Sequence, residues 1–466
     1  DPIITSNASI KELLIKSGGN LTINGATLTV SKNAIVKGAS GSSGIICNTT
    51  GNISVTGTST YERYIPADTW HLLSIPNSNS DITQLTGLYV QSFDEATPAW
   101  VNLTSSSSLN AMQGYGVRYN TSAQTISFTG SFNNGSESIS VTNADTGDDT
   151  ETYGWNLVGN PYPSPIDWGA SLGWDKSDIT GTAYIWDGST YRPLPYLSSN
   201  LIPPTQGFFV YSTVSSGTLG MDNQVRVKGD GSFYKGSLYS NLKIDISQEE
   251  KKDNLQIFFH PEGTDEFDKQ YDGYKLFSWV EEVPQIYTIT NSENKLLAIN
   301  TLNSELLSDI QNPITLKIGY RTNIEGPISI GVTHIEAFNE DIAIGIYDNV
   351  LNIFQDITNF PYEFTSEIGE FNDRFVIYIT KAPNTISELS NNLINCYTYN
   401  NTLVIKSKEP INNGKILVYD VLGRPIINKS LTTKTHHVFT IPEKTDIFVV
   451  NIIQDETFLY RKTLVK

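Results

Sequence analysis

Trp155-Asn-Leu-Val-Gly-Asn-Pro161 repeats an earlier stretch of the chain, Trp70-His-Leu-Leu-Ser-Ile-Pro76. Each stretch opens with tryptophan, contains two adjacent apolar residues and ends in proline, which is typical of a strand that stops at a turn. Together with two further paired stretches in the same order, they predict an internal duplication over residues 61–228, built as a β-sandwich or as two related half-sandwiches. The other pairs are Leu88-Tyr-Val-Gln-Ser-Phe-Asp94 with Ala183-Tyr-Ile-Trp-Asp187, and Gln113-Gly-Tyr-Gly-Val-Arg-Tyr119 with Gln206-Gly-Phe-Phe-Val-Tyr211.

The segment before this duplication, residues 1–60, consists of short apolar runs between turns such as Gly18-Gly19-Asn20 and Asn24-Gly25. Runs this short and evenly spaced cannot close a sandwich of their own. They can stack as rungs that bury their apolar residues on one another. We therefore expect a short N-terminal β-solenoid, with a single meandering sheet as the alternative.

Two further all-β regions follow the duplication. Residues 229–384 hold strand candidates at the spacing of another β-sandwich, for example Leu255-Gln-Ile-Phe-Phe259. Residues 381–395 are polar and irregular, which is typical of a linker. Residues 385–466 would form the last domain, where the pattern from Leu403 to Val465 predicts an immunoglobulin-like sandwich of about seven strands. The expected fold class is therefore all-β throughout.

Composition excludes several classes of partner. The 466 residues carry 31 Lys and Arg against 49 Asp and Glu, a formal net charge of −18. Nucleic acids and anionic membranes both require a basic surface, so neither is expected as a partner. Cys47 and Cys396 are too few for a disulfide scaffold, and no apolar run reaches the roughly 18 residues of a membrane span. The chain opens with Asp1-Pro2-Ile3 and no leader pattern, so we expect an exported form that begins after a removed signal, or a fragment of a longer protein.

The sequence lacks the short motifs that mark common catalytic sites. It contains no Gly-x-Ser-x-Gly and no His-Glu-x-x-His, and its five histidines stand in no recognisable catalytic context. A glycosidase would need two facing carboxyl groups, and sequence alone cannot select such a pair from 49 acidic residues. We therefore expect these residues to hold no catalytic site.

An acidic loop is a weak candidate for calcium. Residues 143–151 gather four carboxylates around Gly147, and calcium prefers six to eight oxygen ligands. The spacing is not that of an EF-hand, so an ordinary solvated loop is the alternative. The candidate ligands are Asp145, Asp148, Asp149 and Glu151.

Aromatic residues crowd the second half of the duplication. Such side chains can stack on sugar rings and form a glycan-binding face, or they can serve as the core and loop packing of the sandwich. Both interpretations remain open from the sequence. The residues are Trp168, Trp174, Trp186, Tyr191 and Tyr196.

The C-terminal stretch carries a pattern of another kind. Lys415-Ile-Leu-Val-Tyr-Asp-Val-Leu-Gly-Arg-Pro-Ile426 has the form of a strand followed by a tight turn, and the chain ends in Lys462-Thr-Leu-Val-Lys466. These residues resemble the C-terminal sorting domain of the type IX secretion system, in its type A or a related subtype. One departure is Asp446-Ile447-Phe448, where many members have a glycine. Upstream segments such as Gly154–Trp168 and Pro204–Val210 also resemble segments of these exported proteins.

The resemblance implies an address and a set of partners. The protein would be exported across the outer membrane, secreted or displayed on the cell surface, by the type IX translocon and its sorting machinery, and it could be joined to a surface lipopolysaccharide. Gly423 would lie in the turn, and the last strand would leave Lys466 at a sheet edge. Arg424 would be held by a carboxylate, with Asp420 the nearest candidate, or by backbone carbonyls. The residues that match the signal are Tyr419, Asp420, Gly423, Arg424, Lys462 and Lys466.

The expected function is accordingly that of an exported, non-catalytic surface protein, either structural or adhesin-like. Two alternatives remain open. The residues could be the C-terminal, non-catalytic part of a larger secreted enzyme, or they could be a glycan-binding module.

Overall fold

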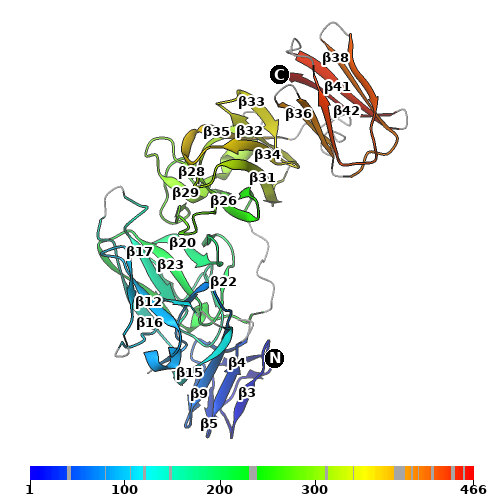
Figure 1. The fold of residues 1–466 in the computed structure, drawn as a ribbon. Helices are drawn as coiled ribbons and strands as arrows, with labels where there is room; N and C mark the ends of the chain where they lie inside the picture. Colours follow the sequence, from blue (N-terminus) through cyan, green and yellow to red (C-terminus); the bar gives the residue numbers. More distant parts are fainter. Residues whose placement is uncertain are drawn as a thin grey trace.

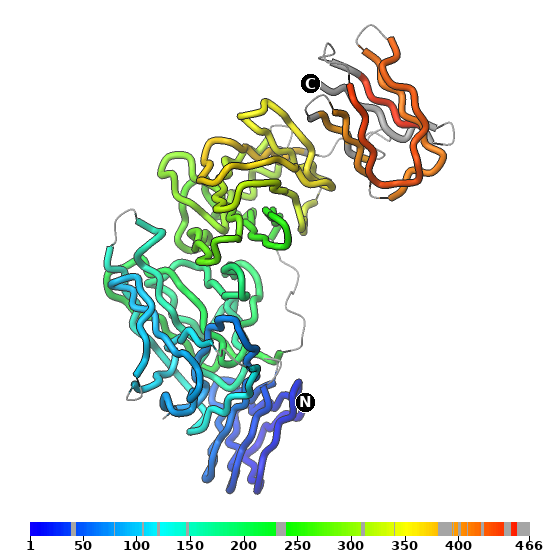
Figure 2. The backbone as a smooth tube through the Cα atoms, viewed as in Figure 1, coloured from blue at the N-terminus to red at the C-terminus, as the bar shows by residue number. Residues whose placement is uncertain are grey.

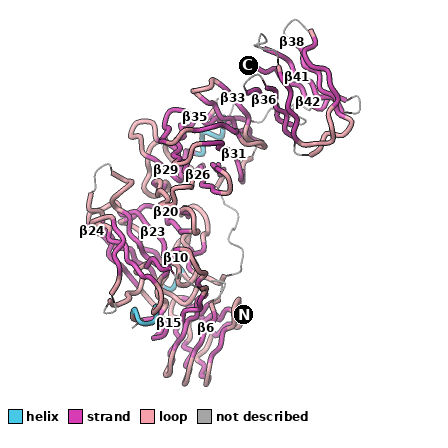
Figure 3. Tube along the Cα trace, in the orientation of Figure 1, coloured by secondary structure: helices cyan, strands magenta, loops and turns pink. Residues whose placement is uncertain are grey.

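The computed structural model is built from β-strands and three short 3₁₀ helices, and its described part contains no α-helix (Figures 1 and 3). The predicted all-β class is therefore confirmed. The modules follow one another along an elongated molecule, with the two termini at opposite ends (Figure 2). The structure describes residues 1–466 except 39–42, 79, 105–106, 119–121, 146–148, 230–238, 310–312, 340, 382–393, 400–401, 408, 421–423, 442–446, 455–456 and 466.

The first nine strands form three parallel ladders, one on each side of a short solenoid. The ladders run β1-β4-β7, β2-β5-β8 and β3-β6-β9, so each turn of chain pairs with the next. This is the pairing that the solenoid prediction requires, and it differs from that of a meandering sheet. The strands are β1 (Ile3–Ile4), β2 (Ala8–Ile10), β3 (Leu13–Ile15), β4 (Asn20–Asn24), β5 (Thr27–Val30), β6 (Ala34–Lys37), β7 (Gly44–Asn48), β8 (Asn52–Val55) and β9 (Ser59–Ile65).

Two units with the same strand order follow the solenoid. The central sheet of the first runs β10-β14-β12-β13 and that of the second β17-β23-β20-β21. In each unit the opening strand also pairs with the closing strand, β9 with β15 and β16 with β24. The equivalent topologies agree with the duplication that the paired motifs predict.

The first unit is entered through β9, which also closes the third ladder of the solenoid. Its further elements are β10 (Trp70–Leu73), β11 (Asn77–Ser78), η1 (Ile82–Leu85), β12 (Tyr89–Asp94), β13 (Ala99–Asn102), β14 (Tyr115–Arg118) and β15 (Gln124–Phe132). The second unit contains β16 (Glu137–Thr142), β17 (Trp155–Gly159), β18 (Ile166–Asp167), β19 (Trp174–Asp175), β20 (Ile179–Trp186), β21 (Tyr191–Leu194), β22 (Leu201–Ile202), β23 (Gly207–Ser212), β24 (Ser216–Met221) and η2 (Asn223–Val225).

The two units exchange hydrogen bonds in a reciprocal way. Gln113 of the first unit donates from Nε2 to the carbonyl of Leu157 in the second, over 3.0 Å. Gln206 of the second donates from Nε2 to the carbonyl of Leu72 in the first, over 3.1 Å. Because Gln113 is the counterpart of Gln206 and Leu72 that of Leu157, the duplication has produced a pseudo-twofold interface.

The backbone next to these glutamines repeats the exchange. Ser74 N donates to Thr205 O over 3.0 Å, and Gly159 N donates to Met112 O over 2.8 Å. Met112 and Thr205 both adopt a left-handed backbone, with φ of 58° and 59°. Non-glycine residues seldom take this conformation, so its recurrence at equivalent positions shows that the interface requires it.

The two motif tryptophans differ in burial, which corrects one expectation. If the two tryptophans were equivalent, each should be a buried anchor of its own unit, but only Trp155 is fully enclosed, where its indole Nε1 donates to the carbonyl of Thr150 over 3.0 Å. Trp70 is only partly buried. The burial of Trp155 follows from its neighbours, since its ring packs edge-on against Tyr184 and Tyr211 within the second unit.

A buried arginine joins the solenoid to the two units. Arg226 is 4% exposed, and its guanidinium donates to Ile45 O of β7, to Ser164 Oγ over 2.9 Å and to Asn134 Oδ1 over 2.7 Å. It also lies 4.7 Å from the centre of the Tyr162 ring. The hydrogen-bond acceptors of Arg226 among the described residues are all neutral, so its several hydrogen bonds take the place of a counter-ion.

Residues 241–381 form one curled sheet of eleven strands that is nearly closed like a barrel. The predicted β-sandwich of two sheets is therefore wrong for this region. Register shifts in β25–β31 and β30–β35 bend the long strands, and their inner faces enclose one apolar core. The elements are β25 (Asn241–Gln248), β26 (Lys251–His260), β27 (Gly273–Tyr274), β28 (Gln285–Ile289), β29 (Leu296–Asn303), η3 (Ser304–Asp309), β30 (Ile314–Thr322), β31 (Gly326–Glu336), β32 (Ile342–Asp348), β33 (Ile353–Asp356), β34 (Tyr362–Ser366) and β35 (Gly369–Lys381).

The C-terminal domain is a sandwich with a core of its own. A sheet ordered β36-β37-β40 faces one ordered β39-β38-β41-β42, and Cys396, Ile405 and Val418 lie buried between them. The final strand pairs with β41 and occupies the sheet edge, as expected. Most of the predicted linker lies outside the described residues. The strands are β36 (Ile394–Tyr399), β37 (Thr402–Ser407), β38 (Gly414–Asp420), β39 (Pro425–Ser430), β40 (His436–Thr440), β41 (Ile447–Gln454) and β42 (Thr457–Val465).

The unequal burial of the two tryptophans predicts unequal costs of removal. Trp155→Ala should lower the free energy of unfolding by about 3–5 kcal/mol, because it leaves a large cavity in a packed core. Trp70→Ala should cost clearly less, because Trp70 is only partly buried. Urea denaturation of both variants measures the difference, and equal losses would contradict the account.

The reciprocal interface makes a second prediction about stability. Gln113→Ala and Gln206→Ala should each lower the free energy of unfolding by about 1–3 kcal/mol, because each removes a hydrogen bond to a carbonyl of the opposite unit. The exposed Gln224 supplies a matched control, and Gln224→Ala should change the value by less than about 0.5 kcal/mol. Thermal and urea unfolding that treat all three variants alike would rule out this role for the two glutamines.

Candidate functional site

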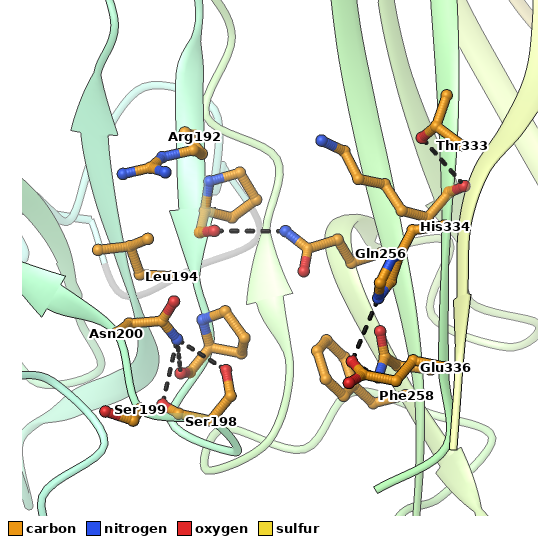
Figure 4. A pocket seen from close by; sticks show the side chains of 14 residues that line it. Arg192, Leu194, Ser198, Ser199, Asn200, Gln256, Phe258, Thr333, His334 and Glu336 are labelled. Carbon is orange, nitrogen blue, oxygen red and sulfur yellow. Dashed lines mark hydrogen bonds and ion pairs between the residues drawn. The ribbon is translucent and has the colours of Figure 1, made fainter. Parts of the chain in front are cut away.

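A polar cleft separates the second unit from the barrel. It has a volume of about 440 Å³ and lies between strand β21 with the loop after it, on one side, and β25, β26 and β31 on the other (Figure 4). Clefts of this size between domains are common ligand sites. The lining residues are Arg192, Pro193, Leu194, Pro195, Ser198, Ser199, Asn200, Asn241, Lys243, Gln256, Phe258, Thr333, His334 and Glu336.

The barrel wall of this cleft is an ordered grid of side chains. Alternation along β25 turns Leu242 and Ile244 into the barrel core, so that Asn241 and Lys243 face outward. Cross-strand pairing then sets the neighbours of each outward residue. Asn241 pairs with Phe258 and Glu336, and Lys243 pairs with Gln256 and His334.

The opposite wall is held in shape by its own hydrogen bonds. The amide of Asn200, which is 7% exposed, donates to Pro195 O over 2.9 Å and to Ser198 Oγ over 2.8 Å. Asp167 accepts from Asn200 N over 3.0 Å and from Ser199 Oγ over 2.7 Å. The loop is thereby fixed before any ligand arrives.

Few contacts cross the cleft or neutralise its charges. Gln256 Nε2 donates to Pro193 O over 3.3 Å and so bridges the two walls. Lys243 Nζ lies 3.9 Å from Asp245 Oδ1, a distance too long for a strong hydrogen bond. The backbone of Arg192 pairs with Ile185 of β20, and its guanidinium makes no hydrogen bond or ion pair with any residue that the structure describes.

The acidic partner of this region is Glu336. Its carboxylate lies 3.2 Å from His334 Nε2 on the same strand and accepts from Asn241 Nδ2 over 3.4 Å. Figure 4 shows His334 and Glu336 on the barrel side, facing Ser198 and Asn200. The cleft therefore offers cations, a carboxylate, amides and hydroxyls over a short span.

The aromatic residues considered as a glycan face are used for packing. Trp168, Trp186 and Tyr191 are buried in the cores of the molecule. Lys176 Nζ lies 4.3 Å from the ring centres of both Trp168 and Tyr196 and donates to Trp168 O over 2.8 Å. Burial lowers the pKa of Lys176 to about 7, and Asp167 opposes that shift. The protein's own cation thus occupies the cage where a ligand would have to stack.

The residues of the C-terminal motif are partly visible. Asp420 Oδ1 accepts from Arg424 N over 2.9 Å and Oδ2 accepts from Arg424 Nε over 2.6 Å, as expected from the motif. Tyr419 belongs to β38 and Lys462 to β42. Gly423 and Lys466 lie outside the described residues.

The acidic loop does not assemble a metal site from its described members. No group of three or more His, Cys, Asp or Glu side chains that could hold a metal occurs in the described part of the chain. Asp149 accepts from Thr152 N over 3.0 Å, and Glu151 accepts from Arg321 Nη2 over 3.1 Å. Asp145 is exposed. Asp148 lies outside the described residues, so calcium binding stays a prediction.

Comparison with known proteins places the chain in a family. A model described as a domain of unknown function (DUF8693) matches residues 1–198 and again residues 187–379. The chain belongs to this family. The matched region runs from the solenoid to the end of the barrel and stops before the C-terminal sandwich. No curated protein matches the chain.

The described helices include none that is long and apolar enough to cross a membrane.

Sequence reasoning did not find the cleft, because its residues are spread from Arg192 to Glu336 and form no motif. One sequence pattern did indicate the barrel wall of the cleft. Polar residues occupy alternate positions of strongly apolar strands, which marks one face of the sheet as exposed. These residues are Asn241, Lys243 and Gln256. The sequence gives no indication that the second unit lies opposite that face.

Proposed function

We propose that this protein is a non-catalytic surface protein, structural or adhesin-like, which its C-terminal domain directs through the type IX secretion system. The supporting observation is the pair at the end of β38, where the exposed Arg424 is bound by Asp420 through two hydrogen bonds. A secretion receptor must read a fixed surface, and this pair presents a charged group in a defined position.

The architecture of the domain fits a transferable signal. Its core is made by its own two sheets, so it does not need the body of the protein to fold. The last strand, β42, lies at the sheet edge and is open to pairing with a partner. The translocon and the sorting machinery would be the partners, and lipopolysaccharide would be the surface anchor. The alternative is the C-terminal, non-catalytic part of a larger secreted enzyme.

Removal of residues 386–466 tests the proposal in a bacterium that has this secretion system. The truncated protein should accumulate in the periplasm, whereas the full chain reaches the surface. Protease accessibility on intact cells measures the difference. Surface display of the truncated form would contradict the proposal.

A point variant separates recognition from folding. Arg424→Ala should strongly reduce export while lowering the free energy of unfolding of the domain by less than about 1 kcal/mol, because the Arg424 side chain is 74% exposed. Lys415→Ala, at an exposed lysine of the neighbouring β38, is the matched control and should be exported normally. Normal export of Arg424→Ala would remove this residue from the signal.

A further inference from the structure

We propose that the cleft between the second unit and the barrel binds a saccharide that carries carboxylate groups, such as a stretch of polyuronate. This goes beyond the export proposal and does not depend on it, because binding can be measured with the purified chain. No residue of the C-terminal motif contributes to the cleft.

The lining of the cleft matches the chemistry of a sugar. Vicinal hydroxyls both donate and accept hydrogen bonds, and the hydroxyl of Ser198 and the amide of Gln256, which line the cleft, can do the same. Pro193 and Pro195 add flat apolar surface beside these groups. A volume of about 440 Å³ lies within the range of ligand sites.

Charge selects an acidic sugar. The whole chain has a net charge of −18, yet Arg192 and Lys243 both line this cleft, and Glu336 is the only carboxylate among its described lining residues. Within the described part of the chain, the Arg192 guanidinium has no partner and the Lys243 ammonium has only the distant Asp245. A carboxylate on the ligand would give both cations a charge-assisted hydrogen bond.

The same lining disfavours a nucleotide. Among the described lining residues, Phe258 is the only one with a benzenoid or indole ring, and it is only 3% exposed. The other aromatic group there is the imidazole of His334. A base would therefore find no open benzenoid or indole ring on which to stack, although stacking contributes much of the binding of single-stranded nucleic acid.

The walls are prepared for binding. Asn200 and Asp167 fix the loop on one side, and the strand pairing of β25 with β26 and β31 fixes the other. Little side-chain or loop freedom would be lost when a ligand enters, which favours affinity. Lys243 and Arg192 are the groups that remain available to adjust to a carboxylate.

Isothermal titration calorimetry of the purified full chain tests the proposal with trimers of galacturonate, guluronate and mannuronate, and with neutral hexose trimers of the same length. At least one uronate trimer should bind at least about tenfold more tightly than the neutral trimers, and salt should weaken that binding.

The double variant Arg192→Gln and Lys243→Gln should lose at least about tenfold in affinity for the uronate trimer. Glu336→Gln should bind the acidic trimer more tightly than the wild type, because it removes a repelling charge.

Lys251→Gln is the matched control. This exposed lysine is on β26 but does not line the cleft, and its loss should leave binding unchanged. Melting temperatures of all variants establish that they are folded, and Glu336→Gln keeps the test decisive if the double variant is not. The proposal is overturned if no uronate trimer binds, if neutral trimers bind equally well, or if the folded cation variants bind like the wild type.

Discussion

The reciprocal hydrogen bonds of Gln113 and Gln206 are the constraint on which the body of this protein depends. The side-chain amide of each glutamine donates a hydrogen bond to a strand of the other unit. Backbone hydrogen bonds beside each glutamine also join the two units. The two central sheets are therefore locked together at their equivalent strands. Once this interface is fixed, the second unit has one orientation relative to the first, and everything that packs against both is placed as well.

The neighbouring modules attach to this paired unit by buried polar contacts. Arg226 joins it to the solenoid through neutral acceptors. On the barrel side, Asp253 accepts from Lys275, from Thr190 Oγ1 over 3.1 Å and from Ile286 N over 3.0 Å, with Asp253 and Lys275 both fully enclosed. Asp253, Lys275 and Ile286 all belong to the barrel, so the hydrogen bond from Thr190 is the contact that ties this buried group to the second unit. Because Asp253 is buried, loss of that hydrogen bond would leave part of a buried carboxylate unsatisfied.

Local patterns in the sequence predicted the all-β class and the paired strands of the two units, but not how strands and modules distant in the chain contact one another. The paired tryptophan and Gln-Gly stretches predicted a duplication because equivalent strands need equivalent residues. The short runs before residue 60 predicted the solenoid for the same kind of reason. The barrel was mistaken for a sandwich because sheet closure depends on register shifts, such as the one at Lys243 and Ile244, which leave no mark in strand spacing. Trp70 and Trp155 look alike in sequence and differ in burial because each packs against residues distant in the chain.

Functional residues, too, could be predicted only where they form a local sequence pattern. The C-terminal motif is local, so its residues could be named before the structure, and Asp420 does bind Arg424. The cleft is made by three strands and a loop from two modules, so only the fold brings its residues together. The body ends with β35, and the C-terminal sandwich has a core of its own, so the proposed secretion signal and the proposed binding cleft lie in separate modules.

The most direct test of this account transfers the C-terminal domain alone. Residues 385–466 would be fused to a periplasmic reporter protein, and surface exposure of the reporter would be measured in cells with and without a functional type IX translocon. The account predicts that the fused reporter reaches the surface only when the translocon is present. A reporter that stays in the periplasm of both strains would contradict it.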